Sequence, residues 1–357
     1  MTEEINRKNK PKSVLKKIIK SVLIIAALAI IIASFLLYRY AFMPNVNLAK
    51  AETTYVYIPS GSTYQDVLEI LSENNILKNT KTFKWLAEQK NYPNHVYPGK
   101  YKIEDDMDNN SLINMLRSGE QQTINLIFTN IRTKEQLAGH IAKRIEADSV
   151  SIINMLNNDL VMQEYGLEAE TAALLFIPNT YEFFWNTSAK QLLDRMHREY
   201  QNFWNTDRIS KARELNFTPQ QIGILASIVQ QETIHPDEMD IIAGVYINRL
   251  KKGIPLQADP TIVYAHGDFA IKRVLKKHLD SDSPYNTYKN RGLPPGPISI
   301  PTPTAIDKVL NYKKHDYLYF CANDDFSGYH VFSRTYQQHL INARKYQKEL
   351  NKQNIMK

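Results

Sequence analysis

The sequence has a single cysteine, Cys321, among 357 residues. One thiol excludes an internal disulfide and a cluster of thiolate metal ligands. Glycine is also scarce, at 12 residues, and the chain lacks a Gly-rich phosphate loop, a GxSxG nucleophile elbow and an HExxH zinc motif. The nine histidines are scattered without metal-ligand spacing. We therefore expect no metal and no nucleotide cofactor, which leaves acid–base chemistry by carboxylates as the candidate activity.

Basic residues exceed acidic ones, for a net charge of +7, but the excess is local. Residues 1–20 hold seven basic and two acidic side chains, or +5, so the other 337 residues carry only +2. A nucleic-acid-binding protein would instead gather its positive charge on a folded face. We therefore expect no nucleic-acid partner, and a basic tail over residues 1–20.

A charge-free, almost wholly apolar run follows at Ser21–Tyr38. As a helix its eighteen residues would span ~27 Å, close to the ~30 Å hydrocarbon core of a bilayer. The basic tail predicts a cytoplasmic N-terminus, with the rest of the chain outside. A cleaved signal peptide is the alternative, because Ala27-Leu28-Ala29 has the small-x-small form of a cleavage site. That triplet lies inside the apolar run, whereas cleavage sites normally follow it, so we expect an uncleaved single-pass anchor.

The rest of the chain predicts an α+β protein. After a tether at residues 39–52, turn and capping residues divide residues 53–120 into a strand, two helices, a strand and a short helix. From residue 121 onward the pattern is mixed, with helices expected at 149–165, 188–204, 237–250 and 336–350. Loops and strands dominate between residues 251 and 335, where proline and tyrosine are frequent.

One helix delivers a notable carboxylate, Glu232. Thr218 is a good N-cap, Pro219 suits the first helical position, and Gln221 completes a capping-box pattern. Glu232 continues the apolar stripe that includes Leu225 and follows Val229 by three residues. Burial there would favour the neutral, proton-donating carboxyl that a general acid needs near pH 7. The alternative is a solvated Glu at a fraying helix end.

Several ordered motifs accompany this helix. They are LASIVQQET at 225–233, AGVYINRL at 243–250, LQADPTIVY at 256–264, YNTY at 285–288, GLPPGPI at 292–298, and His330-Val331-Phe332 with Thr335 and His339. Together they resemble the signatures of the MltG-type (YceG-like) endolytic murein transglycosylases. The resemblance implies a LysM-like module at residues 53–120, a YceG-like catalytic domain at 121–350, and Glu232 as the catalytic residue. It also implies peptidoglycan glycan strands as substrate, at the outer (periplasmic) side of the inner cell membrane, beside peptidoglycan synthases.

Two departures from that family accompany the match. Many members carry a second Glu two residues before the catalytic one, where this chain has Gln230, and many have a LEG run where this chain has Ala172-Ala173-Leu174. Neither change removes Glu232 or the surrounding motifs. We therefore expect activity to persist, with a different pH profile if the second carboxylate tunes the acid.

The loops after Glu232 supply candidate substrate contacts. Amide and hydroxyl groups on Gln257, Asn286 and Thr287 can hydrogen-bond sugars, and tyrosine rings can pack on sugar faces while offering a hydroxyl. The tyrosines in question are Tyr264, Tyr285 and Tyr288. Asp259 precedes a proline and reads either as a turn former or as a site residue. Structural roles remain open for all of them, because tyrosine is frequent throughout the chain.

Three functions remain open at this level. A lytic transglycosylase needs one carboxylate, because the C6 hydroxyl of the N-acetylmuramoyl (MurNAc) residue attacks its own anomeric carbon and leaves a 1,6-anhydro-MurNAc end. A muramidase would use water, with Asp259 or Glu182 as the second carboxylate. A non-catalytic glycan-binding scaffold for synthases is the third. The first is favoured, with cleavage of the bond between MurNAc and N-acetylglucosamine (GlcNAc) in nascent strands.

Overall fold

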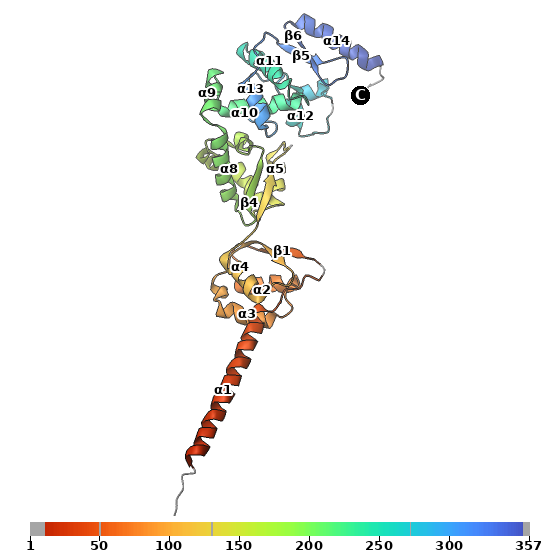
Figure 1. Cartoon of the computed structure of the whole chain (residues 1–357). Coiled ribbons are helices and arrows are strands. Elements are labelled where there is room, and N and C mark those ends of the chain that lie inside the picture. Colours follow the sequence, from red (N-terminus) through yellow and green to blue (C-terminus); the bar gives the residue numbers. More distant parts are fainter. Residues whose placement is uncertain (1–10, 50, 130, 272, 353–357) are drawn as a thin grey trace, which may run out of the picture. The chain divides into compact units, whose positions relative to one another are not determined.

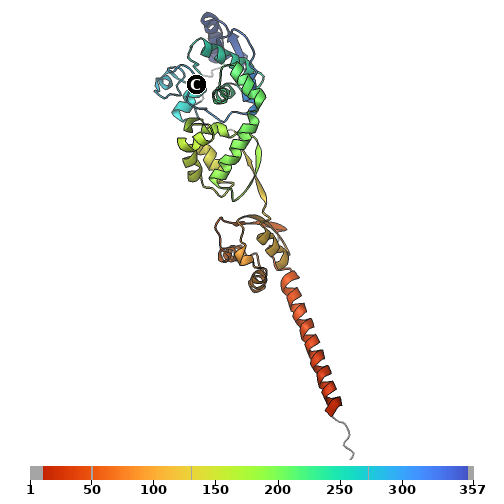
Figure 2. The ribbon, with the colours of Figure 1, turned by 90° about the vertical axis from the view of Figure 1, so that its left-hand side faces the viewer.

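The computed structural model describes residues 11–49, 51–129, 131–271 and 273–352. Contacts between residues divide the chain into two compact units (Figures 1 and 2). The first unit holds the N-terminal part of the chain up to Thr123, together with Phe184–Asn186. The second holds Ile124–Phe183 and everything from Thr187 onward. Each unit has its own hydrophobic core.

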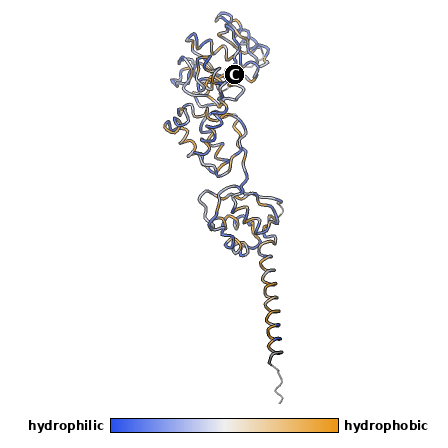
Figure 3. Tube along the Cα trace, turned by 60° about the vertical axis from the view of Figure 1, so that its left-hand side comes forward, coloured by the Kyte–Doolittle hydropathy of each residue, from blue (hydrophilic) through white to orange (hydrophobic). Residues whose placement is uncertain are grey.

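The N-terminal helix α1 (Pro11–Phe42) contains the predicted apolar run. Its segment Leu15–Phe42 is long and apolar enough to cross a membrane, and none of that segment's most apolar window is buried in the protein. Figure 3 shows hydrophobic residues along most of this helix. Residues 1–10, which hold part of the predicted basic tail, lie outside the described residues. The helix therefore has the length and composition of a single membrane anchor.

The remainder of the first unit has the predicted order of elements. Strand β1 (Thr53–Ile58) is followed by α2 (Tyr64–Glu73), α3 (Thr80–Gln89), the short η1 (Tyr92–Asn94), β2 (Gly99–Glu104) and α4 (Asn109–Ser118). The two strands pair antiparallel, with Thr53 opposite Glu104 and Ile58 opposite Gly99. Thr63 is the N-cap of α2, and it forms a capping box with Asp66. Val67, Leu71, Phe83, Tyr101 and Leu112 are fully buried between these elements.

The segment predicted as a tether, residues 39–52, is built into this unit instead. Pro44 and Val46 form isolated β-bridges with Asp108 and Leu77. Asn45 is buried, and its amide donates to the carbonyl oxygen of Asn79 at 3.0 Å and to Oδ1 of Asn109 at 2.7 Å. A short stretch of mixed polar and apolar residues carries no periodic signal for such long-range bonds, so the sequence could not reveal them. Residues 44–48 of the segment expected as a tether are therefore bonded to the rest of the first unit.

The second unit begins with two strands and a group of helices. Strand β3 (Thr123–Ile127) pairs with β4 (Thr180–Phe184) in a two-stranded sheet. The helices of this part of the chain are α5 (Lys134–Ala142), α6 (Ser149–Leu156), α7 (Asp159–Glu164), η2 (Ala169–Leu175), α8 (Ala189–Phe203) and α9 (Thr206–Glu214). The predicted helix 149–165 is thus two helices, because Asn158 caps a new one through its side chain.

The central helix of the second unit is α10 (Pro219–Glu232), which packs against α13 (Pro303–Leu310), α11 (Met239–Lys251) and α12 (Asp259–His266). A short η3 (Lys276–Asp280) follows α12. The chain ends with the antiparallel strands β5 (Tyr319–Ala322) and β6 (His330–Ser333) and with α14 (Tyr336–Lys352), which packs on both strands. This last hairpin and helix form a layer beside α11.

The structure explains why one position of the GLPPGPI run, residue 296, is a glycine. A Cβ on Gly296 would lie 2.2 Å from the carbonyl oxygen of Glu170 and 2.7 Å from the hydroxyl of Tyr285. Only a residue without a side chain lets these two stretches of backbone approach so closely. The run therefore fixes the path of the chain beneath α10.

Candidate active site

Helix α10 carries Glu232 as its last residue. The predicted capping box is present: the Thr218 hydroxyl accepts from the backbone N–H of Gln221, and the Gln221 side chain accepts from that of Thr218. Every residue from Ile222 to Val229 is buried, so the helix is surrounded by protein rather than exposed on one face. A helix fixed in this way holds its terminal carboxylate in a defined place.

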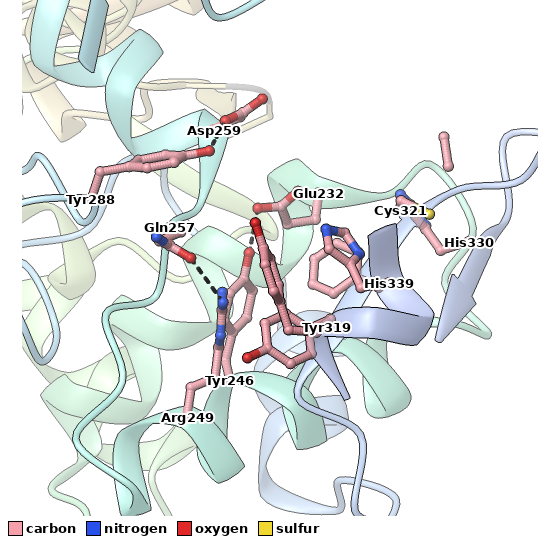
Figure 4. Close-up of a pocket in the computed structure, with 13 residues that line it drawn as sticks. Glu232, Tyr246, Arg249, Gln257, Asp259, Tyr288, Tyr319, Cys321, His330 and His339 are labelled. Carbon is pink, nitrogen blue, oxygen red and sulfur yellow. Dashed lines mark hydrogen bonds between the residues drawn. The ribbon is translucent and has the colours of Figure 1, made fainter. Parts of the chain in front are cut away.

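The side chain of Glu232 lines a cavity of about 380 Å³ (Figure 4). The cavity is formed by the end of α10, by α11, by the start of α12 and by the β5–β6–α14 layer. Its lining residues are Glu232, Tyr246, Arg249, Gln257, Asp259, Tyr288, Tyr319, Phe320, Cys321, Ala322, His330, Tyr336 and His339. All of them belong to the second unit.

The Glu232 carboxylate accepts a hydrogen bond from the hydroxyl of Tyr246 on α11. Burial raises the pKa of Glu232 from 4.5 to about 7, and the nearby carboxylate of Asp259 adds to the rise, while Tyr246 and Arg249 oppose it. Removal of a carboxyl from water favours its neutral form. Near neutral pH, Glu232 therefore exists in both forms and can give a proton and take one back.

Arg249 is the cation of this cavity and is only 7% exposed. Its Nη1 donates to the carbonyl oxygen of Leu256 at 2.5 Å, and its Nη2 donates to Oε1 of Gln257 at 2.9 Å. The guanidinium also lies 5.3 Å from the centre of the Tyr319 ring. Arg249 thus ties α11 to the loop before α12 and orients the amide of Gln257.

Asp259 and Tyr288 form a second carboxylate–tyrosine pair at the cavity. The Tyr288 hydroxyl donates to Oδ1 of Asp259 at 2.5 Å. Burial raises the pKa of Asp259, and the hydrogen bond from Tyr288 partly offsets that rise. Asp259 also begins α12, with Pro260 in its first turn, so it lies at a helix start as well as at the cavity.

Four predicted contact residues do not line the cavity. Asn286 and Thr287 are buried, and their side chains bond within the protein: Asn286 donates to the carbonyl oxygens of Leu279 and Ser281, and Thr287 accepts from the backbone N–H of Ala258. Tyr264 and Tyr285 pack against each other, with ring centres 4.7 Å apart. These residues shape the loops that place Gln257 and Tyr288. Of the predicted set, the structure brings together Glu232, Gln257, Asp259 and Tyr288.

Tyr246, Arg249 and Tyr319 were not singled out as site residues from the sequence, and His330 and His339 were named only as residues of a family motif. Tyr319, His330 and His339 form one wall of the cavity. Tyr246 and Arg249 are three residues apart on α11 and so share one face, a spacing that was readable from the sequence. The Tyr319 ring stacks on that of His339 at 5.4 Å. His330 is held by Glu238, whose carboxylate accepts from its backbone N–H at 2.8 Å and lies 2.9 Å from its Nδ1. No local pattern predicts that this wall faces Glu232.

Gln230, at the place of the second Glu of many family members, does not line the cavity. Its Oε1 accepts from the backbone N–H of Thr302 at 2.7 Å, and its Nε2 donates to the carbonyl oxygen of Ile300 at 3.3 Å. A carboxylate cannot make the second of these bonds. Gln230 therefore anchors the start of α13, and the structure gives it no direct contact with Glu232.

Replacing Tyr246 by Phe should shift the high-pH limb of the pH–activity profile to higher pH. The Tyr246 hydroxyl lowers the pKa of Glu232 from the higher value that burial alone would set. Without that bond the carboxyl holds its proton to higher pH, so if Glu232 is the acid, as the sequence leads us to expect, activity should persist there. The rate of cleavage of uncrosslinked glycan strands, measured from pH 5 to 9 for both proteins, tests this. A limb that stays in place would show that Tyr246 does not influence the titrating group.

Comparisons with known proteins place this fold and cavity in a family. The sequence matches the YceG-like family over residues 56–345, so the chain belongs to that family. A protein of Bacillus subtilis named endolytic murein transglycosylase is 29% identical over 333 residues, which cover 89% of this chain and 91% of the relative. A Streptococcus pneumoniae protein of the same name is 28% identical, but the match spans only 54% of that longer relative.

A solved structure adds to this result. The crystal structure of a yceG-like protein from Listeria monocytogenes aligns with 81% of this chain and 98% of its own, with a TM-score of 0.54 and 27% sequence identity. The similarity thus extends from sequence to fold.

Proposed function

We propose that this chain is a membrane-anchored endolytic peptidoglycan lytic transglycosylase, with Glu232 as its acid and then its base. The observation that carries the proposal is the half-buried carboxyl of Glu232, with a pKa raised to about 7, at the edge of a cavity of about 380 Å³. The name borne by the Bacillus subtilis and Streptococcus pneumoniae relatives, endolytic murein transglycosylase, supports the same activity.

The proposed reaction needs no second carboxylate. Protonated Glu232 gives its proton to the oxygen of the MurNAc–GlcNAc bond as the bond from that oxygen to the MurNAc anomeric carbon breaks. The C6 hydroxyl of the same MurNAc forms the new bond to that carbon, and its proton passes to the Glu232 carboxylate. The products are a free GlcNAc hydroxyl and a 1,6-anhydro-MurNAc end, with no water consumed and Glu232 protonated again. Attack within one ring has a high effective molarity.

A water-using muramidase remains the second candidate, because one observation favours it: Asp259 lies at the same cavity and is close enough to raise the pKa of Glu232. Glu182, the other carboxylate considered for this role, is exposed on β4 and does not line the cavity. The two reactions differ in product mass by one water. A non-catalytic scaffold would give no product at all, which a zymogram with peptidoglycan in the gel detects.

Gln257 gives this proposal a prediction about the substrate. Its Oε1 accepts from Arg249, and this bond orients the amide so that the N–H groups of Nε2 can be offered to a ligand (Figure 4). A sugar acetamido carbonyl accepts such a bond, whereas the ammonium of a de-N-acetylated sugar is itself a donor. We therefore propose that Gln257 favours N-acetylated strands.

Replacing Gln257 by Glu should weaken that preference. The new carboxylate can still accept from Arg249, but it repels a carbonyl and accepts from an ammonium. The ratio of cleavage rates on N-acetylated and de-N-acetylated strands should fall by roughly tenfold, the effect of about one hydrogen bond. Tyr288→Phe, which changes the same wall without an amide, should alter both rates alike. An unchanged ratio in Gln257→Glu would contradict a role for Gln257 in this choice.

The proposed setting is the outer face of the inner cell membrane. Helix α1 would cross the bilayer once with the N-terminus in the cytoplasm, as the basic residues before Ser21 favour, and the second unit would cut nascent strands on the periplasmic side. Work beside peptidoglycan synthases would follow from that position, because the strands are made there. The LysM-like assignment of residues 53–120 is also a proposal; it rests on the order of strands and helices in the first unit.

A further inference from the structure

The end of α1 is fixed to the folded part of the first unit. The side-chain amide of Asn109 on α4 donates to the carbonyl oxygen of Tyr40 at 2.8 Å. The Tyr40 ring meets that of Trp85 on α3 edge to face, with centres 5.7 Å apart. Ala41 is buried. Helix α1 therefore enters the unit as one continuous element and packs on α3 and α4 without a flexible connection (Figure 1).

The position of Tyr40 relative to a bilayer follows from the charges on α1. Lys20 and Arg39 bound the charge-free run, so Ser21–Tyr38 fills the hydrocarbon core and Arg39 marks its outer edge. Tyr40 lies only two residues beyond Tyr38, which is ~3 Å along a helix. The headgroup layer on each side of a bilayer is about 5–7 Å deep. Tyr40 is therefore inside that layer, and Trp85, in contact with it, must be at about the same depth.

The exposed face of α3 has the composition of a membrane-interface surface. Lys81 and Lys84 are exposed one turn or less from the half-buried Trp85, while Phe83 and Leu86 point into the core. Among the residues that the structure describes, neither lysine forms an ion pair, and Glu88 is the one acidic side chain of this face. Tryptophan is favoured at headgroup depth, and lysine side chains are attracted to anionic lipid headgroups.

Apolar side chains at the same level add to this surface. Phe42 and Met43, at and just past the end of α1, are 49% and 42% exposed, although the unit has a core that could cover them. Residues so close to the hydrocarbon edge meet lipid rather than water. Their exposure is therefore explained if this side of the unit lies on the bilayer.

We propose that α3 is a membrane-contact helix, with Trp85 in the headgroup layer and Lys81 and Lys84 on anionic lipid headgroups. The contact rests on the proposed crossing of the membrane by α1. Its partner is the lipid of the same bilayer that α1 spans. The contact holds the first unit against the membrane at a fixed height.

Tryptophan fluorescence in vesicles tests the proposal on the full chain. The protein is reconstituted in phosphatidylcholine–phosphatidylglycerol vesicles, and flotation confirms that it is anchored. Emission is then recorded with phospholipids brominated near the headgroup end of the acyl chains, which quench only nearby rings. The chain has three tryptophans, Trp85, Trp185 and Trp204. Quenching should be present in the wild type and largely lost in Trp85→Phe.

Trp185 provides the matched control within the same unit. It packs on Tyr57 of β1, with ring centres 5.1 Å apart, and Figure 1 places β1 on the side of the unit away from α1. Trp185→Phe should therefore keep the lipid-dependent quenching. Replacing both Lys81 and Lys84 by Glu should weaken the quenching of Trp85, because the headgroups then repel the helix.

The outcomes separate this contact from the anchoring. A chain that floats with the vesicles but shows the same quenching in the wild type and Trp85→Phe would overturn the α3 contact and leave the anchor standing. A chain that fails to float would overturn the anchor, and the contact with it. Neither result bears on the activity assigned to Glu232, which is measured on strands in solution.

Discussion

Replacing Glu232 by Gln should reduce strand cleavage by on the order of 10²-fold or more, the usual loss when a general acid is removed. The amide keeps the volume of the carboxyl and can still accept from Tyr246, but it has no proton to transfer. The rate is measured on uncrosslinked glycan strands by counting new strand ends over time. Substantial cleavage by the variant would remove Glu232 as the acid and turn attention to Asp259.

The stability of the same variant provides its control for folding. The folded-state pKa of Glu232 is about 7 and its ordinary value is 4.5. A raised carboxyl pKa means that the folded protein binds the proton more tightly, so wild-type stability falls as pH rises from 4.5 through 7. Above pH 7 the wild type has lost at most about 3 kcal/mol of its free energy of unfolding through this group. Glu232→Gln should therefore match the wild type near pH 4 and be more stable at pH 8, as thermal unfolding followed by circular dichroism would record.

Replacing Arg249 by Met should have the second largest effect, a loss of roughly tenfold to a hundredfold in cleavage rate. The variant leaves the carbonyl of Leu256 and the amide oxygen of Gln257 without their donors. The loop that carries Gln257 can then shift, and small displacements of positioning groups can cost up to about 10²-fold. Loss of the cation also raises the pKa of Glu232 further, since Arg249 now lowers it.

Arg249→Lys separates the two contributions. Lysine keeps the positive charge but cannot make the paired bonds of a guanidinium. The pKa of Glu232, read from the pH profile, should remain near that of the wild type, while the rate should fall as the Gln257 loop loosens. A fully active lysine variant would show that charge alone matters, and a fully active methionine variant would contradict the positioning role of Arg249.

Features with a local physical cause were predictable from the sequence. The capping residues around Thr218 and Thr63 define helix starts because their side chains satisfy backbone N–H groups within three residues. The length of the apolar run Ser21–Tyr38 predicted helix α1, although the helix extends to Phe42. The raised pKa of Glu232 also followed from its place after the apolar stripe.

Features that depend on contacts between distant segments were not predictable. Gln257 and Tyr288 reach the cavity, whereas Asn286 and Thr287, from the same YNTY run as Tyr288, are buried and support the loop. A single sequence shows that these residues are polar, but not which of them the fold turns inward. The wall of β5, β6 and α14 faces Glu232, although the two are separated by about a hundred residues in the sequence. No periodic pattern in a sequence predicts packing between segments so far apart.

The region after residue 251 illustrates the same limit in secondary structure. The sequence predicted mainly loops and strands there, yet LQADPTIVY contains helix α12 and the proline-rich stretch leads into α13. Proline was taken as a mark of loops, but in both helices it occupies the first turn, where its missing N–H is not needed. The same residue type thus signalled a helix start.

The mass of the cleavage product is the most direct test of the central claim. The full chain in detergent micelles is incubated with purified, uncrosslinked glycan strands, and the new ends are weighed by mass spectrometry, with Glu232→Gln in parallel. The account predicts 1,6-anhydro-MurNAc ends, formed without added water, from the wild type and almost none from the variant. New reducing ends heavier by one water would contradict it and identify a muramidase.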